Sequence, residues 1–450
     1  MYSDTITALA TPPGIAGLAV VRVSGKDAIN ILSKCFKSTI PIEQALPNTI
    51  LHGYFYDNEQ LIDEVTASIF KEPKSYTGED VIEIGCHGGY FIANNIIKIL
   101  IDNGARLAEP GEFTKRAFLN GKLDLTQVEA VSDLIHSLSE KAVQTATRQL
   151  DGGFTKRIKE LRSKLIEIAV LLELEIDFFD EDIELIEKNN LIEKIKESKS
   201  YCLQLANSYK NAEILRSGYF VAIVGFPNSG KSTLFNSLLQ KERAIVSEIP
   251  GTTRDYLEET IYVKGIPIKL IDTAGIRPTD DYIEIEGIRL AQKIIKQANL
   301  ILIINDINLG IKYSKKLYEQ IHKKFPDSEI NLVQNKIDKI DYKNHKYDDL
   351  FNISAKENIG IDKLIDYFFE KAENSIVAFN DVLVNQRQAI LLIKAVEEIN
   401  LGLDAINNKF ENEIISIHIK ETSKLLGEIT GESWNEEVLH SIFSKFCIGK

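Results

Sequence analysis

The sequence predicts a multidomain fold, in which an α/β domain interrupts a discontinuous all-α helical domain that follows an α+β amino-terminal domain. Strand and helix patterns alternate from about Gly218 to Ser375, which is typical of a doubly wound parallel sheet. Apolar residues recur at helical spacing both before and after this region. Because one helical region stops where the α/β region starts and another begins where it ends, we expect an inserted domain.

The chain is therefore predicted to divide into four segments. The connectors near Ser217 and Ser375 are expected to act as hinges of the inserted domain. The predicted segments are an amino-terminal domain over 1–122, a first helical segment over 123–216, the inserted domain over 217–375, and a second helical segment over 376–450.

Composition narrows the class of protein. The chain has 450 residues, a net charge of -13 and four widely spaced cysteines without a CxxC pair, so neither a disulfide framework nor a zinc site is expected. No basic residue precedes Arg22 and no apolar run is long enough to span a bilayer, which predicts a cytoplasmic protein without membrane association. The negative charge argues against a broad basic surface, so RNA contact should be local or shared with a partner.

The clearest motif lies at the start of the α/β region. The segment "YFVAIVGFPNSGKSTLF" reads as a strand, a glycine-bounded loop and a helix that begins at Lys231. In GxxxxGKS, backbone N–H groups can surround phosphates at the helix N-terminus, Lys231 adds positive charge, and the Ser232 hydroxyl can bind magnesium. The segment therefore predicts a P-loop.

Three later motifs indicate which nucleotide binds. "IKLIDTAG" ends an apolar strand in Asp272, placed to hold magnesium through water, and Gly275 can turn its N–H toward the γ-phosphate. "NKID" and "SAK" end two further strands. A carboxylate at Asp338 can accept two hydrogen bonds from guanine, whereas adenine lacks the exocyclic amine and would leave the acceptor unpaired. The inserted domain is thus predicted to be a P-loop GTPase domain.

One position departs from many small GTPases. The residue after DxxG is Ile276, which cannot orient the attacking water as a glutamine does. Glu284 is the first candidate for that task and Glu286 the weaker one. For charge developing between the phosphates, Arg254 and Arg277 remain candidates, as does a monovalent cation held by Asn228.

"GFPNSGKS", "IPGTTRD", "DTAGIR" and "NKID" together resemble the translation-factor-related GTPases that use potassium. The resemblance implies that Asn228, Ser247, Ile249 and Thr252 would ligate potassium, that Thr253 would join Ser232 on magnesium, and that Glu284 would orient water. The predicted GTP-binding residues are Asn228, Ser229, Gly230, Lys231, Ser232, Thr233, Ser247, Thr252, Thr253, Asp272, Thr273, Ala274, Gly275, Asn335, Lys336, Asp338, Ser354, Ala355 and Lys356.

The amino-terminal region contains an unusual carboxylate. "ATPPGIAG" predicts a turn between two strands, and a second apolar strand, "VIEIGC", is interrupted by Glu83. Burying an unpaired carboxylate is costly, so Glu83 should face a cation, a ligand N–H or solvent. "EPGEFTKRAFLNGKLDL" then predicts a turn, a short helix and a second helix that begins near Asp124.

The order of these motifs, closed by "FCIGK", resembles the MnmE (TrmE) family of tRNA-modification GTPases along essentially the whole chain. The resemblance implies a folate one-carbon donor bound by Arg22, Glu83, Lys122 and Lys450, with Cys447 at the modification site. A pterin presents a guanine-like edge of N–H donors, which a carboxylate such as Glu83 can recognise.

The resemblance also implies partners and a reaction. Such proteins form a homodimer and act with an FAD-dependent partner of the MnmG (GidA) type, in a heterotetramer or larger assembly. With GTP, magnesium, potassium and a tetrahydrofolate derivative, they add an aminomethyl or carboxymethylaminomethyl group to the wobble uridine of certain tRNAs. Ammonium and glycine both remain open as the second donor.

Two other functions fit some of the motifs. A ribosome-assembly GTPase would need a basic RNA-binding domain such as a KH fold, and we find none. A folate-binding aminomethyl carrier with a purely regulatory GTPase fits the same motifs.

Overall fold

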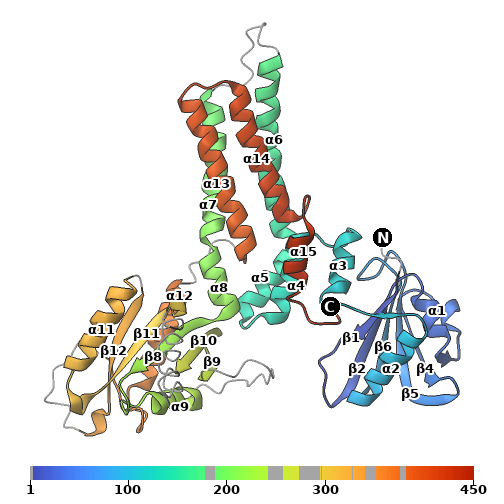
Figure 1. The fold of residues 1–450 in the computed structure, drawn as a ribbon, viewed down its shortest axis with the longest axis horizontal. Helices are drawn as coiled ribbons and strands as arrows, with labels where there is room; N and C mark the ends of the chain where they lie inside the picture. Colours follow the sequence, from blue (N-terminus) through green and yellow to red (C-terminus); the bar gives the residue numbers. More distant parts are fainter. Residues whose placement is uncertain are drawn as a thin grey trace, which may run out of the picture. The chain divides into compact units, whose positions relative to one another are not determined.

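The computed structural model describes residues 4–177, 188–241, 257–272, 294, 296–326, 328–339, 351–375 and 382–450. The chain divides into two compact units (Figure 1). The first unit holds residues 1–132, 148–202 and 390–450, and the second holds residues 133–147 and 203–389. No helix in the described ranges is long and apolar enough to cross a membrane.

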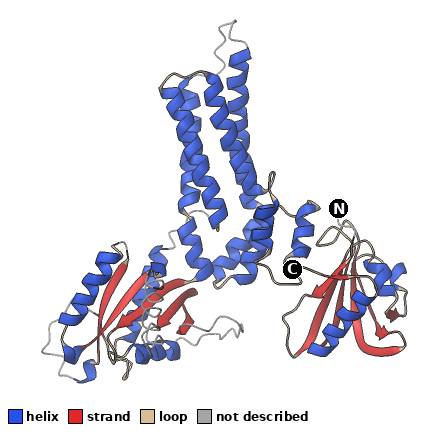
Figure 2. Ribbon diagram, viewed as in Figure 1, coloured by secondary structure: helices blue, strands red, loops and turns tan. Residues whose placement is uncertain are grey.

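The first unit contains a mixed sheet with helices packed on one face (Figure 2). Its strand order is β3-β4-β5-β6-β2-β1-β7. The strands are β1 (Ile6–Leu9), β2 (Ala16–Ser24), β3 (Phe36–Ser38), β4 (Thr49–Asp57), β5 (Gln60–Phe70), β6 (Val81–Gly88) and β7 (Arg106–Leu107), and the helices are α1 (Ala28–Ser33) and α2 (Tyr90–Asp102).

The alternation of side chains along β6 explains how the sheet carries a carboxylate. Ile82, Ile84 and Cys86 are buried in the core shared with α1 and α2. Successive side chains of a strand point to opposite faces, so Glu83 lies on the face away from these helices. The predicted β1–β2 hairpin is confirmed, and β2 pairs with β6 so that Arg22 lies opposite Glu83.

Helices make up the rest of the first unit and its connections. α6 packs along α14, and the start of α4 packs with α3, α15 and the chain end in one apolar cluster. The helices are α3 (Glu112–Leu119), α4 (Leu125–His136), α5 (Glu140–Leu150), α6 (Gly153–Asp177), α7 (Lys188–Asn207), α8 (Tyr209–Ser217), α13 (Gln386–Asn407), α14 (Asn412–Thr430) and α15 (Glu436–Phe443).

The second unit is built on a sheet of order β13-β12-β11-β8-β10-β9. Apolar side chains of its strands, such as Val221, Ile223 and Leu302, form the core with the helices. The elements are β8 (Tyr219–Gly225), α9 (Lys231–Lys241), β9 (Leu257–Val263), β10 (Ile266–Asp272), β11 (Leu300–Asp306), α11 (Lys312–Lys324), β12 (Glu329–Asn335), β13 (Phe351–Asn352) and α12 (Ile361–Ser375).

The parallel sheet predicted for the inserted domain carries one antiparallel strand at its edge. β9 pairs with β10 in antiparallel fashion, whereas the other strand pairs are parallel. Lys264 and Gly265 form the two-residue connection, and both have positive φ angles of 49° and 82°. A tight turn of this kind joins only antiparallel strands, because a parallel pair needs a long crossover.

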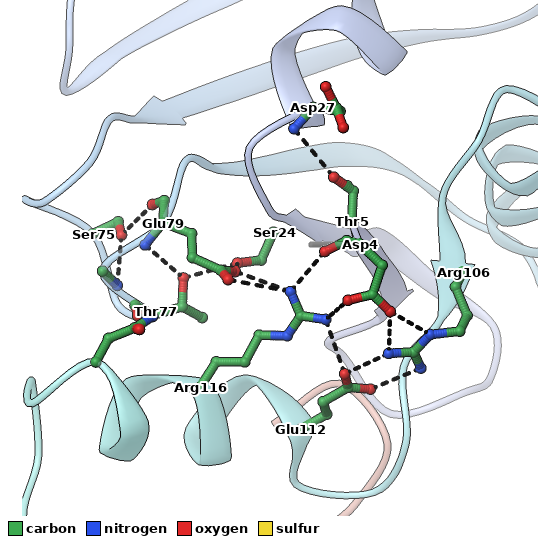
Figure 3. A network of polar contacts seen from close by, with 12 residues as sticks. Asp4, Thr5, Ser24, Asp27, Ser75, Thr77, Glu79, Arg106, Glu112 and Arg116 are labelled. Carbon is green, nitrogen blue, oxygen red and sulfur yellow. Dashed lines mark hydrogen bonds and ion pairs between the residues drawn. The ribbon is translucent and has the colours of Figure 1, made fainter. Parts of the chain in front are cut away.

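A buried polar network fixes α3 to the start of the chain, and the sequence analysis did not foresee it (Figure 3). Arg116 is fully buried and donates hydrogen bonds to Asp4 Oδ1 at 2.9 Å, Glu112 Oε1 at 3.0 Å and Glu79 at 3.2 Å. Arg106 donates to the same Glu112 carboxylate at 2.7 and 3.0 Å. Two arginines therefore pair with three carboxylates at the edge of the sheet.

Candidate functional site

The second unit builds its candidate site at the carboxyl ends of parallel strands, the usual ligand position in this type of sheet. β8 leads into the P-loop, and α9 begins at the predicted Lys231. Gly230 has a φ of 96°, and a Cβ there would lie 2.2 Å from Asn335 Nδ2. This close approach requires glycine, and it brings the "NKID" strand against the P-loop.

Lys231 lies within this loop. Its Nζ donates hydrogen bonds to the carbonyl oxygens of Gly225 at 2.9 Å and Phe226 at 3.0 Å. Burial lowers the pKa of Lys231, and the nearby Asp272 carboxylate opposes this shift. The ammonium group is thus held at the loop, where phosphate oxygens can be its partners.

Ser232 and Asp272 supply the oxygens suited to magnesium. Ser232 Oγ donates to Asp272 Oδ2 at 3.0 Å, and Asp272 is fully buried at the end of β10. A hydroxyl and a carboxylate are hard oxygen ligands of the kind that magnesium prefers beside nucleotide phosphates. No group of three or more acidic, histidine or cysteine side chains that could hold a metal ion occurs in the part of the chain that is described, so phosphate oxygens and water would complete the coordination.

Asn335 joins the base-recognition loops to the P-loop. Its Nδ2 donates to Ser229 O at 3.0 Å, and its Oδ1 accepts from the backbone N–H groups of Lys336 at 2.8 Å and Ala355 at 3.0 Å. The Asn335 side-chain amide thus forms hydrogen bonds with the P-loop, the "NKID" segment and the "SAK" segment. The predicted "NKID" and "SAK" segments are therefore held together at one place.

Asp338 presents a carboxylate beside these loops. Its Oδ1 accepts a hydrogen bond from Ser354 Oγ at 2.5 Å. That hydrogen bond lowers the pKa of Asp338, so the side chain is ionised at neutral pH. An exposed carboxylate held by one oxygen can accept the two N–H donors of guanine.

The first unit has a second candidate site, which we call the tail site and define as Arg22, Glu83, Gly449 and Lys450. Arg22 Nε and Nη2 donate to Glu83 Oε1 at 3.0 and 2.8 Å, and Nη1 donates to Gly449 O at 3.2 Å. Burial and the adjacent Arg22 lower the pKa of Lys450, which Glu83 partly offsets. Glu83 faces a cation, as the sequence analysis allowed.

The rings of Tyr76 and Phe113 fix the position of Arg22 further. The guanidinium carbon lies 5.6 Å from the Tyr76 ring centroid and 5.5 Å from that of Phe113. Cation–π contacts of this length stabilise a guanidinium in a defined orientation. Both Glu83 bonds use Oε1, which leaves Oε2 as the oxygen that a ligand N–H can approach.

Backbone contacts hold the chain end at the tail site. Gly449 has a φ of 99°, and a Cβ there would lie 2.1 Å from Leu9 O. The carbonyl of Cys447 accepts hydrogen bonds from the N–H groups of Gly111 at 3.4 Å and Lys450 at 3.3 Å. The last four residues therefore pack against the sheet and α3.

Comparisons with known proteins identify the family. The family model described as "MnmE helical domain" matches residues 125–447, and the one described as "GTP-binding protein TrmE N-terminus" matches residues 5–122. A protein of Christiangramia forsetii named tRNA modification GTPase MnmE is 40% identical, over 100% of this chain and 99% of its own length. The chain belongs to the MnmE family of tRNA modification GTPases. The family and the multidomain fold class predicted from the sequence are confirmed.

Other MnmE relatives match just as fully. The proteins of that name from Acetivibrio thermocellus and Thermoanaerobacter pseudethanolicus are 39% and 41% identical, each over 100% of both chains. Among solved structures, a variant of Era from Aquifex aeolicus bound to GDP and AlF4− shares 26% identity over 40% of this chain and 67% of its own, with a TM-score of 0.27.

The second unit contains a site residue that the sequence analysis missed. Lys336 Nζ donates to Asp306 Oδ2 and to Asn228 O, both at 2.6 Å. Lys336 thereby links Asp306, at the end of β11, to the P-loop. Burial raises the pKa of Asp306, but the hydrogen bonds from Lys336 and Asn308 and the charge of Lys336 together outweigh it and leave that pKa lowered. The signal was available, since Asp306 ends the apolar strand "LILIIND" as Asp272 ends its own strand.

The Ser229 side chain indicates that a ligand binds at the P-loop. Within the described ranges its hydroxyl is buried and has no hydrogen-bond partner. A buried hydroxyl without a partner is costly, and a bound phosphate or cation would satisfy it. Beside it, Asn228 has a φ of 61° and an exposed side chain.

Several predicted MnmE site residues lie outside the described residues. They are the switch-loop, charge-stabilising and water-positioning candidates Ser247, Ile249, Thr252, Thr253, Arg254, Thr273, Ala274, Gly275, Arg277, Glu284 and Glu286. Thr233 and Lys356 are described, and Lys356 Nζ lies 3.2 Å from a Glu357 carboxylate oxygen.

Two residues predicted for the folate-binding and modification site, Lys122 and Cys447, are not part of the tail site. Lys122 Nζ donates to Pro73 O at 3.0 Å, on the loop that also carries Tyr76, and no contact joins it to the tail site in the described structure. Cys447 is exposed, whereas Cys35, Cys86 and Cys202 are buried. Burial raises the pKa of these three thiols to about 12, 11 and 12, which makes them unreactive.

Proposed function

We propose that this chain uses a magnesium- and potassium-dependent GTPase cycle to time the folate-dependent modification of a wobble uridine in certain tRNAs. Membership of the MnmE family makes it a GTP hydrolase acting in tRNA modification. The observation that carries the finer proposal is the presence, in one chain, of a guanine-type P-loop site and a tail site where Arg22, Glu83 and Lys450 meet.

The potassium step rests on the chemistry of Asn228. The main-chain carbonyl oxygen of Asn228 already accepts a hydrogen bond from Lys336. The oxygen that Asn228 can offer to a cation is therefore that of its exposed side-chain amide. A cation there would lie beside the P-loop, where negative charge develops during hydrolysis. Ser247, Ile249 and Thr252 would complete its ligands, Thr253 would join Ser232 on magnesium, and Glu284 would orient water.

GTP turnover is therefore expected to be at least about tenfold faster in KCl than in NaCl at equal ionic strength, because the smaller sodium ion fits oxygen ligands set for potassium poorly. Steady-state phosphate release would measure the effect, and Asn228→Ala should abolish the difference between the salts. Equal rates in the two salts would remove the cation from the mechanism.

The folate step rests on Glu83. Its Oε2 is the carboxylate oxygen that Arg22 leaves to a ligand, and a pterin edge carries matching N–H donors. Lys450 would supply positive charge for the ligand's carboxylates. Lys122 would do the same after its ammonium group moves away from the Pro73 carbonyl. Cys447 would lie beside the one-carbon unit as the exposed thiol of the chain.

Glu83→Gln is expected to weaken binding of a tetrahydrofolate derivative about tenfold to a hundredfold, the equivalent of one charged hydrogen bond worth about 1.5–3 kcal/mol. Isothermal titration calorimetry would measure it. Glu64→Gln, on the neighbouring strand and paired with His52, provides the matched control. Unchanged folate affinity in Glu83→Gln would remove this residue from the site.

The assembly state is included in the proposal. Ile15 and Phe91 are 100% and 86% exposed, and Leu18 is 60% exposed, near the end of β6 where Ala16 pairs with Gly88. Exposed apolar groups of this size usually mark a protein interface. They support a homodimer through the amino-terminal domain, which would act in the cytoplasm with an FAD-dependent MnmG-type partner.

A further inference from the structure

The outer face of α11 carries positive charge that neither candidate site uses. Five lysines are exposed on this helix, and Ser314 and Ile321 on its other side are buried. At about 100° per residue the five fall within an arc of about 180°. Glu319 is the helix's one acidic residue. We call this face the lysine stripe, made of Lys312, Lys315, Lys316, Lys323 and Lys324.

The lysine stripe differs from four lysines elsewhere in its unit. Lys241, Lys264, Lys269 and Lys371 each form an ion pair with a carboxylate. Across the described ranges, by contrast, none of the five stripe lysines has a carboxylate partner. In a chain of net charge -13, five lysines with Glu319 as the one carboxylate of the helix among them leave a net positive local field that attracts anions.

Aromatic rings lie at one end of the stripe. The side chain of Tyr313 is 63% exposed and that of Phe226 is 40% exposed, with ring centroids 6.2 Å apart in an edge-to-face arrangement. Exposed aromatic rings beside a basic groove are typical of surfaces that stack unpaired bases of RNA.

We propose that the lysine stripe binds the phosphate backbone of an unpaired RNA segment, with Tyr313 and Phe226 stacking one of its bases. The inference rests on the proposed function, from which tRNA is the RNA available. The stripe is about 18 Å long at 1.5 Å per residue, enough for several phosphates of one unpaired strand. A local patch of this size agrees with the overall negative charge of the chain.

Such a contact would reach the nucleotide site. Phe226 follows Gly225 in the P-loop, and its carbonyl accepts the hydrogen bond from Lys231 Nζ. A base stacked on Phe226 therefore touches the loop that holds the phosphates. tRNA bound at the stripe should change the rate of GTP hydrolysis in the full-length chain.

The test compares two triple variants of the full-length protein for binding to a transcribed tRNA over a series of salt concentrations. Lys315→Gln, Lys316→Gln and Lys323→Gln together remove three stripe charges. Lys156→Gln, Lys159→Gln and Lys164→Gln remove the same charge from exposed positions of α6. The stripe variant should bind at least about tenfold more weakly, with a salt slope smaller by roughly 2 to 3, and the α6 control should bind as the natural protein does.

A second variant separates stacking from charge. Tyr313→Ala should lower tRNA affinity roughly fivefold or more and leave the salt slope unchanged. GTP turnover without tRNA should stay normal in every variant, which excludes misfolding.

Each other outcome counts against the inference. A stripe variant that binds tRNA normally overturns it and leaves the proposed function intact. A stripe variant that keeps tRNA but no longer binds the FAD-dependent partner shows a protein-docking face instead. If the natural protein itself binds no tRNA at low salt, direct tRNA binding in the proposed function fails together with the inference.

Discussion

Asp338→Asn is expected to lower the affinity for GTP by at least about a hundredfold and to raise the affinity for xanthosine triphosphate. The Asp338 carboxylate offers two acceptors to the ring N–H and exocyclic amine of guanine, and Ser354 holds one of its oxygens in place. A carboxamide offers one acceptor and one donor. Xanthine has a carbonyl where guanine has its amine, so it matches the variant, and sites that hydrogen-bond such groups discriminate strongly.

Equilibrium titration with fluorescent GTP and xanthosine triphosphate analogues would measure the switch. Asp366→Asn, an exposed carboxylate on α12 that pairs with Lys264, removes the same charge away from the loops and should leave both affinities unchanged. If Asp338→Asn still preferred GTP, the assignment of Asp338 to base recognition would be wrong.

Arg116→Met is expected to destabilise the first unit by about 3–5 kcal/mol, because removing one partner of a buried ion pair leaves charge uncompensated. Arg116 is the fully buried centre of the network that joins Asp4, Glu79 and Glu112 (Figure 3). The chain's single tryptophan reports on this region, since the Trp434 ring lies 6.1 Å from that of Phe118 on α3. Tryptophan fluorescence during urea unfolding would therefore measure the change.

The control is Arg162→Met, which removes a partly exposed arginine that pairs with Glu432 and should cost less than Arg116→Met. Equal unfolding midpoints for Arg116→Met and the natural protein would show that the network contributes specificity rather than stability.

Low pH should weaken the network around Arg116. Burial raises the pKa values of Asp4 and Glu112, but their hydrogen bonds and the charges of the neighbouring arginines together outweigh it and leave both pKa values lowered. A carboxyl group whose folded pKa is depressed contributes stability above its unfolded pKa of about 4, and loses it as pH falls through the folded pKa. The natural protein should therefore lose stability below about pH 4, and Arg116→Met should show a smaller loss.

The sequence predicts structure and site residues best where residues adjacent in the chain determine them. The P-loop, the strand ending in Asp272 and the helix starting at Lys231 are each specified by adjacent residues, and the structure confirms them. The sheet's antiparallel edge was missed because a Lys-Gly turn carries a weaker signal than the strands that it joins.

Contacts between distant residues account for the other omissions. Arg116 and Asp4 are 112 positions apart, and Lys336 and Asp306 are 30 apart, so no periodicity in the sequence reveals either pair. The sequence shows only that Gly449 is near the end of the chain. The reason that position 449 requires glycine is that a Cβ there would clash with the Leu9 carbonyl, which is distant in the sequence. The tail site was expected from a family resemblance alone.

Nucleoside analysis of tRNA tests the proposed function most directly. In cells that lack this gene, mass spectrometry should find wobble uridines without their aminomethyl or carboxymethylaminomethyl group. The natural gene should restore that group, whereas Glu83→Gln should not, although its GTP turnover is normal. Unchanged wobble uridines in the deletion strain would contradict the account and favour a folate carrier whose GTPase is only regulatory.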